Sequence, residues 1–149
     1  GLTKYRNQKV AIIFQSYNLL NYMTAAQNVS SALSMTKSKH TGDKDYIYAT
    51  LEKLGINRTL ADKNVQQLSG GQQQRVAIAR ALAVDAKIVI ADEPTGNLDE
   101  ENTQEVIKIF QELAHEVGKT VILVTHEPNV AQAADVQISL KNRQFTIVE

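Results

Sequence analysis

Apolar residues recur along this chain with two periods, and the two kinds of segment alternate. Short, nearly continuous apolar runs occupy residues 9–15, 88–91 and 120–125, a pattern typical of buried strands. Between these runs, apolar residues recur at the spacing of a buried helix face. This alternation predicts an α/β fold with a mostly parallel sheet. The helices are expected around residues 24–33, 47–54, 70–83 and 100–117.

Local signals mark where several of these helices begin and end. Thr24, followed three residues later by Gln27, is a capping-box pattern, so a helix is expected to begin there. Gly55 and Gly118 stand where two helices are expected to stop. The apolar stripe from Val106 to Val117 is assigned to the core of the protein.

The end of the chain predicts a short helix followed by a hairpin. Pro128 suits the first turn of the helix. Residues 136–140 and 144–148 are expected to pair, with Asn142 and Arg143 in the turn. Because arginine tolerates a left-handed conformation less well than glycine, we expect this turn to differ in type from an Asn-Gly turn.

Composition narrows the possible functions. Sixteen basic and sixteen acidic residues give a formal charge of zero, and no basic stripe suggests a nucleic-acid partner. The chain has no cysteine, which excludes disulfides and thiolate metal sites and fits a reducing compartment. No apolar run approaches the ~20 residues that span a bilayer. Any membrane role is therefore expected to depend on a partner.

Polar residues follow two of the predicted strands. Asp92 and Glu93 follow one strand, and His126 follows the next. Because parallel strands end at one edge of a sheet, these side chains are expected to be neighbours, although 33 positions separate Glu93 from His126. The pair Gly70–Gly71 opens an alanine-rich helix, where backbone N–H groups can approach an anion closely. These features predict a site that handles phosphate.

One phosphate-binding pattern does not occur in the sequence. The loop G-x-x-x-x-G-K-[ST] needs two glycines and a lysine in a fixed frame, and none of the seven glycines supports it. We therefore expect the chain to be part of a nucleotide-driven protein without its N-terminal section, and to bind nucleotide weakly by itself. Sheet strands would be missing with that section, so we expect exposed apolar surface and self-association.

Four motifs in a fixed order resemble those of the ATPase subunits of ABC transporters. The segment LSGGQQQRVAIARAL, with Ser69, Gly70, Gly71 and Gln72, resembles the family's signature motif. KIVIADEPTGNLD, which ends at Asp99, resembles the Walker B strand and D-loop. FQSYNLL resembles the glutamine loop, and VTH the switch histidine. The GNLD and YNLL contexts resemble the export group that handles macrolides, antimicrobial peptides and released lipoproteins.

The resemblance implies catalytic and metal-binding roles at the predicted sheet edge. Asp92 would hold Mg²⁺ through water, because this hard cation prefers oxygen ligands. Glu93 would act as general base or polarise the attacking water. Gln15 would sense both the Mg²⁺ and that water. The alternatives are a solvated carboxylate pair at Asp92 and Glu93 and a plain polar strand end at Gln15.

The other implied roles concern the terminal phosphate of ATP. His126 would contact the γ-phosphate. The signature segment 69–72 would bind a γ-phosphate held by the opposite subunit, through hydroxyl and backbone donors. Asp99 would belong to the interface between the subunits. Without the resemblance, His126 is a structural histidine, the signature segment a flexible helix cap, and Asp99 an ordinary helix N-cap.

The resemblance also implies an organisation and a function. Residues 16–80 would form a helical signature subdomain, and residues 1–15 and 81–149 a partial catalytic core of the P-loop NTPase type. The parent protein would be the ATP-binding subunit of an ABC exporter and would hydrolyse ATP with Mg²⁺ on the cytoplasmic side of the membrane. Its partners would be a second ATPase subunit and a membrane permease.

Two other functions stay open at this point. One is a non-transport ABC ATPase of the cell-division type; the chain has no long insertion between Gln15 and Ser69, which argues against the repair type. The other is a non-hydrolysing fragment that supplies only the signature motif to a second subunit.

Overall fold

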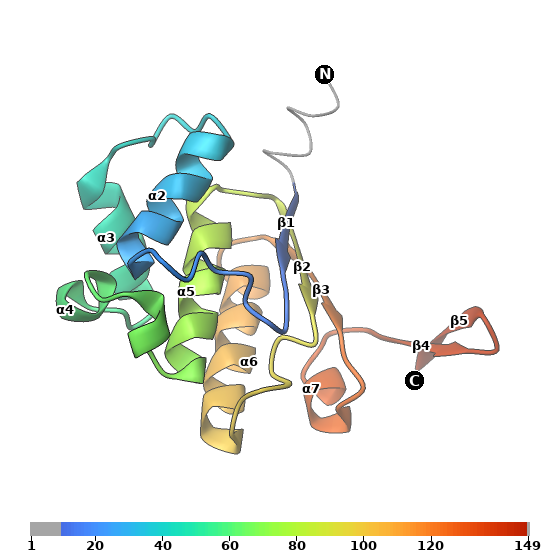
Figure 1. Cartoon of the computed structure of the whole chain (residues 1–149). Coiled ribbons are helices and arrows are strands. Elements are labelled where there is room, and N and C mark those ends of the chain that lie inside the picture. Colours follow the sequence, from blue (N-terminus) through green and yellow to red (C-terminus); the bar gives the residue numbers. More distant parts are fainter. Residues whose placement is uncertain (1–9, 149) are drawn as a thin grey trace.

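The computed structural model describes residues 10–148, with a three-stranded parallel sheet at its centre (Figure 1). The strands lie in the order β1 (Val10–Ile13), β2 (Ile88–Asp92) and β3 (Thr120–Val124). Both neighbours of β2 run parallel to it, so all three carboxyl ends meet at one edge, as the sequence predicts. Lys9, where the first strand was expected to start, lies outside the described residues.

The helices form two layers beside this sheet (Figure 1). Helix α5 packs against β1 and helix α6 against β3, while α2 and α3 contact the opposite side of α5. Because α5 lies between helices and sheet, its alanine-rich sequence is buried almost all round. The bounds are α2 (Ala25–Met35), α3 (Lys44–Lys53), α4 (Arg58–Ala61), a 3₁₀ turn η1 (Val65–Gln67), α5 (Gly70–Ala83), α6 (Glu100–His115) and α7 (Pro128–Gln132).

The predicted helix boundaries have local physical causes in the structure. Thr24 caps α2 through a complete capping box with Gln27, which satisfies two amides at the helix start. Gly55 and Gly118 adopt φ values of +80° and +81°, a left-handed conformation that glycine takes without steric cost. These predicted stops are therefore confirmed. The expected core position of Val117 is wrong, because α6 ends at His115 and Val117 is 56% exposed.

The strands are less buried than their apolar sequences predict. Residues Ile12, Ile90 and Ile122 lie in register across the sheet, and Ile12 and Ile122 are 49% and 48% exposed. The other face, which carries Ile13 and Val89, is buried under the helices. The prediction of strands buried on both faces is thus wrong for the described residues, since helices cover only one face. Exposed apolar sheet surface itself was expected.

The predicted hairpin is present as a separate two-stranded sheet. Strands β4 (Gln137–Lys141) and β5 (Gln144–Val148) pair antiparallel and extend away from the main sheet (Figure 1). Their two-residue turn has positive φ at both Asn142 (51°) and Arg143 (64°), as a type I′ turn requires. The expectation of a different turn type is therefore wrong: the strand twist imposes the left-handed conformation despite the arginine side chain.

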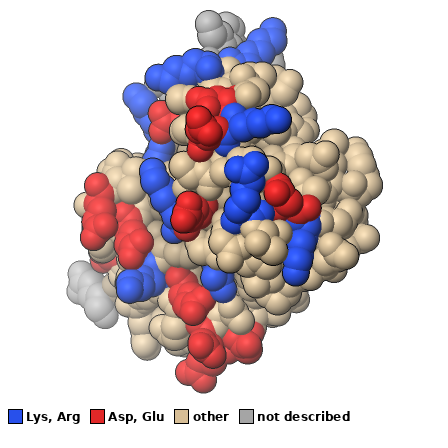
Figure 2. Space-filling view, turned by 90° about the vertical axis from the view of Figure 1, so that its left-hand side faces the viewer, with Lys and Arg blue, Asp and Glu red and all other residues tan. Residues whose placement is uncertain are grey.

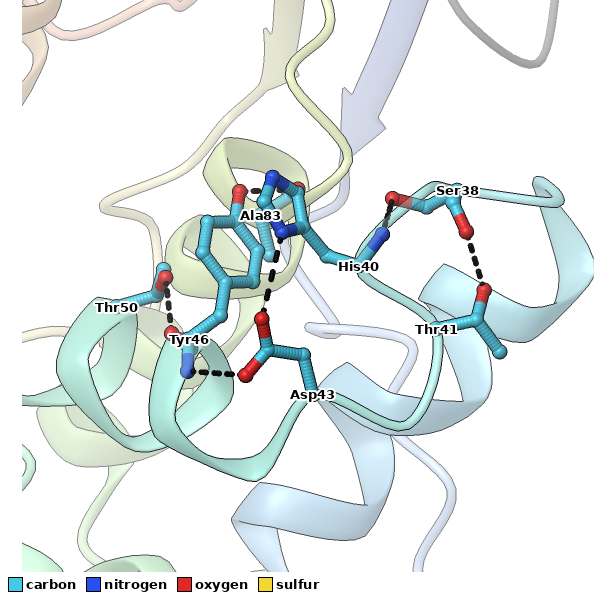
Figure 3. A network of polar contacts seen from close by, with 7 residues as sticks. All are labelled: Ser38, His40, Thr41, Asp43, Tyr46, Thr50 and Ala83. Carbon is cyan, nitrogen blue, oxygen red and sulfur yellow. Dashed lines mark hydrogen bonds and ion pairs between the residues drawn. The ribbon is translucent and has the colours of Figure 1, made fainter.

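A polar network attaches the outer helices to the end of α5 (Figure 3). The hydroxyl of Tyr46, near the start of α3, donates to the carbonyl of Ala83 at 2.7 Å. The ring of His40 stacks on Tyr46 with centroids 3.7 Å apart. Burial, and then the charge of Asp85, raise the pKa of Tyr46, so the hydroxyl keeps its proton and stays a donor. The network joins the helical layer to the last turn of α5.

Charged side chains of both signs share the surface of the helical layer. Figure 2 shows this face, where Lys and Arg side chains alternate with Asp and Glu. Within residues 10–148, the longest helices are too short or too polar to cross a bilayer.

Candidate functional site

The carboxyl edge of the sheet brings Glu93 and His126 together. Atom Nδ1 of His126 lies 2.7 Å from Oε1 of Glu93. The loops that carry them are also tied by their backbones, because the amide of Glu93 donates to the carbonyl of Val124 at 2.7 Å. Glu93 adopts a φ of +48°, which is uncommon for a residue with a side chain and is typical of functional sites. The predicted meeting of carboxylate and imidazole is confirmed.

The two partners of this pair differ in their exposure to solvent. The side chain of His126 is 83% exposed, and that of Glu93 only 20%. The hydrogen bond to Glu93, and then its negative charge, raise the pKa of His126 above the ordinary value. The second oxygen of Glu93, Oε2, is buried without a hydrogen-bond partner among the described residues. A buried carboxylate oxygen without a partner is uncommon and marks Glu93 as a candidate functional residue.

Gln15 and the loop after Glu93 form a second part of the same edge. Gln15 follows β1, and its side-chain amide donates to Oδ1 of Asn97 at 3.4 Å. In return, the side-chain amide of Asn97 donates to the Gln15 carbonyl at 3.3 Å. A methyl group at Gly96 would overlap the Gln15 side-chain amide, so the Gln15 side chain would have to move to accommodate it. The structure thus places Gln15 against the 94–99 loop.

The start of α5 presents the signature residues. Ser69 caps this helix, and Gln72 completes a capping box with it. Gly70 and Gly71 provide the first amides of the helix, and no acceptor within residues 10–148 takes them. The helix cap and the free amides are both present, so this segment can be an ordinary helix cap and can also bind an anion. The helix N-terminus adds partial positive charge, which suits an anion.

Asp92 and Asp99 both lie on the surface of the molecule. Asp92 ends β2 and is exposed. Asp99 caps α6, and its carboxylate accepts the Asn102 amide at 2.8 Å. The N-cap alternative for Asp99 is therefore present in the structure, and it leaves the second carboxylate oxygen available.

Sequence reasoning did not single out three residues that support this edge. Gln74 is fully buried on α5, and its amide donates to the carbonyl of Pro94, the residue after Glu93. Thr95 is buried as well, and its hydroxyl donates to Glu127 at 2.6 Å. The sequence indicates these residues only by their position in or beside the motifs. Only the packing reveals which side chains they reach.

The donor set at this edge fits a magnesium ion that arrives with phosphate. Within residues 10–148, no cluster of three or more acidic, histidine or cysteine side chains forms a complete metal cage. Mg²⁺ in nucleotide sites uses one or two carboxylates, with phosphate and water oxygens as the other ligands. The exposed Asp92 carboxylate and the Gln15 amide oxygen suit that arrangement. Glu93, with its unpartnered buried oxygen, stands beside them.

The fold and the site together define a class of protein. A parallel sheet with polar residues at its carboxyl edge, together with a capped glycine-rich helix start, is consistent with a partial core of the P-loop NTPase type. A family model described as ABC transporter matches residues 2–96, and the chain belongs to this family.

Several relatives have known names or structures. The chain is 50% identical over 149 residues to the ABC transporter ATP-binding protein YclH of Bacillus subtilis, covering 100% of the chain and 66% of YclH. It is 47% identical over 131 residues to the macrolide export ATP-binding/permease protein MacB of Syntrophobacter fumaroxidans, covering 87% of the chain and 18% of MacB.

A solved structure supports this fold. The chain resembles a dimeric, post-hydrolysis ATP-binding cassette of Methanocaldococcus jannaschii bound to ADP and Pi, with a TM-score of 0.83 and 38% identity. The match covers 97% of this chain and 63% of that one. The chain therefore spans about two thirds of the length of the cassettes it matches.

Proposed function

We propose that this chain is the hydrolytic part of the ATP-binding subunit of an ABC exporter, which couples ATP hydrolysis to export of a peptide, drug or lipoprotein. The observation that carries the proposal is the contact between Glu93 and His126 at the carboxyl edge of the sheet. Membership of the ABC transporter family supports it, as does the similarity to MacB, whose name describes macrolide export.

Each side chain at the edge has a proposed task. Glu93 orients and deprotonates the attacking water, and its Oε1 holds the imidazole of His126. His126 is largely exposed, and its Nε2 donates to the γ-phosphate of ATP while Nδ1 stays on Glu93. Asp92 and Gln15 would hold Mg²⁺, which would supply neutralisation of negative charge on the phosphate oxygens.

The signature segment serves a second subunit. The Ser69 hydroxyl and the unpaired amides of Gly70 and Gly71 would bind an anion held by that subunit. Gln72 would keep the helix cap in place, and Asp99 would lie in the interface beside it. The phosphate-cradling loop is supplied by protein outside these 149 residues. A dimer is the natural arrangement, and the related cassette with ADP and Pi is described as dimeric.

A membrane permease is the proposed partner of α2. A hollow of about 350 Å³ lies along this helix between Met23 and Met35. Its lining combines the polar side chains of Gln27, Ser30, Ser31 and Ser34 with two methionines, and Met35 is 75% exposed, so it is accessible to a protein segment. MacB of S. fumaroxidans combines ATP-binding and permease parts in its name. Such contact would hold the protein at the cytoplasmic side of the membrane.

Cross-linking can test the permease contact. These 149 residues contain no cysteine, so Met35→Cys introduces their one thiol at the hollow, and Glu112→Cys introduces a matched thiol on exposed α6. We expect Met35→Cys to cross-link to the co-expressed permease and Glu112→Cys not to do so. Equal yields from the two positions would contradict the assignment.

Hydrolysis is tested in the complete gene product. Glu93→Gln should abolish phosphate release and still permit nucleotide-bound dimers, because the amide keeps the shape but cannot accept the proton. Glu112→Gln, an exposed change on α6, is the control and should hydrolyse ATP normally. Undiminished hydrolysis by Glu93→Gln would refute the role of Glu93.

A further inference from the structure

Two residues outside the proposed chemistry, Thr95 and Glu127, connect the loops that carry Glu93 and His126. Thr95 follows Glu93 by two positions and is only 1% exposed. Its hydroxyl donates to Oε2 of Glu127 at 2.6 Å, and Glu127 follows His126 in the chain. The hydrogen bond therefore joins the loop that carries the carboxylate to the loop that carries the imidazole.

The position of His126 depends on its neighbours in the chain. Its side chain is 83% exposed, and within residues 10–148 its hydrogen bond is to Glu93. Both flanking residues are fixed: the hydroxyl of Thr125 accepts the amide of Glu127 at 3.0 Å, and the Glu127 carboxylate accepts from Thr95. The backbone of His126 is therefore held on both sides, whereas its exposed ring has no packing to hold it.

The Glu127 side chain bonds Thr95 and does not cap helix α7. Glu127 occupies the N-cap position of α7, where a carboxylate normally accepts amides of the first turn. Its side chain makes no such bond, and Pro128 leaves the first position of the helix without an amide. The carboxylate instead reaches the buried hydroxyl of Thr95, which would be left without a partner if Glu127 were removed.

We propose that Thr95 and Glu127 form a latch that holds His126 opposite Glu93, and that both are positioning residues for hydrolysis. The inference rests on the proposed function, in which Glu93 and His126 act on the nucleotide. Thr95 and Glu127 themselves need no contact with ATP. Because a displacement of about 1 Å at a reacting group can cost on the order of 10²-fold in rate, loss of the latch lowers turnover and spares nucleotide binding.

Two matched substitutions at Thr95 test the latch in the complete gene product. Thr95→Val keeps the shape of the side chain and removes the hydroxyl, whereas Thr95→Ser keeps the hydroxyl. We expect Thr95→Val to lower kcat about tenfold or more with KM for ATP within about twofold, and Thr95→Ser to retain most of the activity. Glu127→Ala, at a half-buried position, should reproduce the loss and replaces Thr95→Val if that variant folds poorly.

A double-variant comparison shows whether the latch acts through His126. In a His126→Ala background, Thr95→Val should lower kcat little further, because the residue that the latch positions is gone. Fully additive losses would overturn the inference.

A structural measurement separates this inference from the proposed function. NMR signals of the His126 ring report its hydrogen bond to Glu93, and we expect that bond to weaken in Thr95→Val and to persist in Thr95→Ser. An unchanged bond in Thr95→Val would overturn the latch. If this bond weakens in Thr95→Val, the latch is supported. If His126→Ala also hydrolyses ATP normally, the proposed function is refuted while the latch stands.

Discussion

Oε1 of Glu93 and Nδ1 of His126 lie 2.7 Å apart, although the two residues are 33 positions apart in the chain. The contact exists because β2 and β3 are parallel neighbours whose carboxyl ends coincide, with Asp92 paired to Val124 in the sheet register. One Glu93 oxygen is occupied by the imidazole and the other has no partner within residues 10–148. Glu93 therefore orients His126 through one carboxylate oxygen and keeps the other buried.

The first prediction concerns the protonation of His126. Glu93 raises the pKa of this imidazole above its ordinary value of about 6.5, first through the hydrogen bond and then through its charge. Glu93→Gln should therefore move the pKa down toward that value in an NMR titration. Glu127→Gln should have a smaller effect, since Glu127 contributes least to the shift and the amide oxygen of glutamine can still accept the hydrogen bond from Thr95. A larger effect of Glu127→Gln would contradict this ordering.

The same pair predicts how stability depends on pH. A histidine with a raised pKa in the folded state stabilises the protein fully below its unfolded pKa, and this contribution is lost as pH rises through the folded pKa. The difference in free energy of unfolding between the unchanged chain and Glu93→Gln should therefore shrink above about pH 6.5. Denaturant unfolding on both sides of that pH measures it.

A second prediction concerns the close approach of α5 to α6. A methyl group at Gly71 would overlap the side chain of Asn102, which also bonds Arg75 at 3.2 Å. Gly71→Ala should therefore destabilise the fold by about 1–3 kcal/mol, although alanine favours an isolated helix. Gly70→Ala, whose added carbon would lie 3.2 Å from the Tyr17 hydroxyl, is the milder control. Thermal unfolding measures the stability of both variants. If Gly71→Ala and Gly70→Ala are equally stable, the predicted overlap with Asn102 is contradicted.

A third prediction concerns the attachment of the helical layer. Tyr46→Phe removes the hydroxyl that donates to the Ala83 carbonyl and keeps the ring that stacks on His40. We expect a loss of about 1 kcal/mol in free energy of unfolding, the usual value of such a hydrogen bond. Tyr48→Phe, whose hydroxyl bonds Asp62 on the surface, should cost less. The reverse order in denaturant unfolding would argue against the attachment.

A fourth prediction concerns the exposed face of the sheet. Ile12 and Ile122 lie in one register row and are about half exposed, so the isolated 149-residue chain should self-associate through this face. Ile122→Thr should shift the sedimentation profile toward monomer, whereas Met35→Gln on α2 should not. A clean monomer of the unchanged chain at high concentration would count against this prediction.

Much of the fold could be predicted because its signals are local. The cap at Thr24, the stops at Gly55 and Gly118 and the 70–83 helix depend on residues within a few positions of one another. The turn at Asn142 and Arg143 was predicted wrongly, because the twist of the paired strands outweighs the local preference of arginine. Val117 was assigned to the core on spacing alone, and the helix ends before it.

The order of the motifs in the sequence by itself determined the family and the alternation of strands and helices, because these depend on residue type and spacing. The tertiary structure alone decided the exposed sheet face and the contacts of Gln74, Thr95 and Glu127. Those contacts join side chains far apart in the chain, and only the packing of α5 and the register of β2 with β3 bring them within hydrogen-bonding distance.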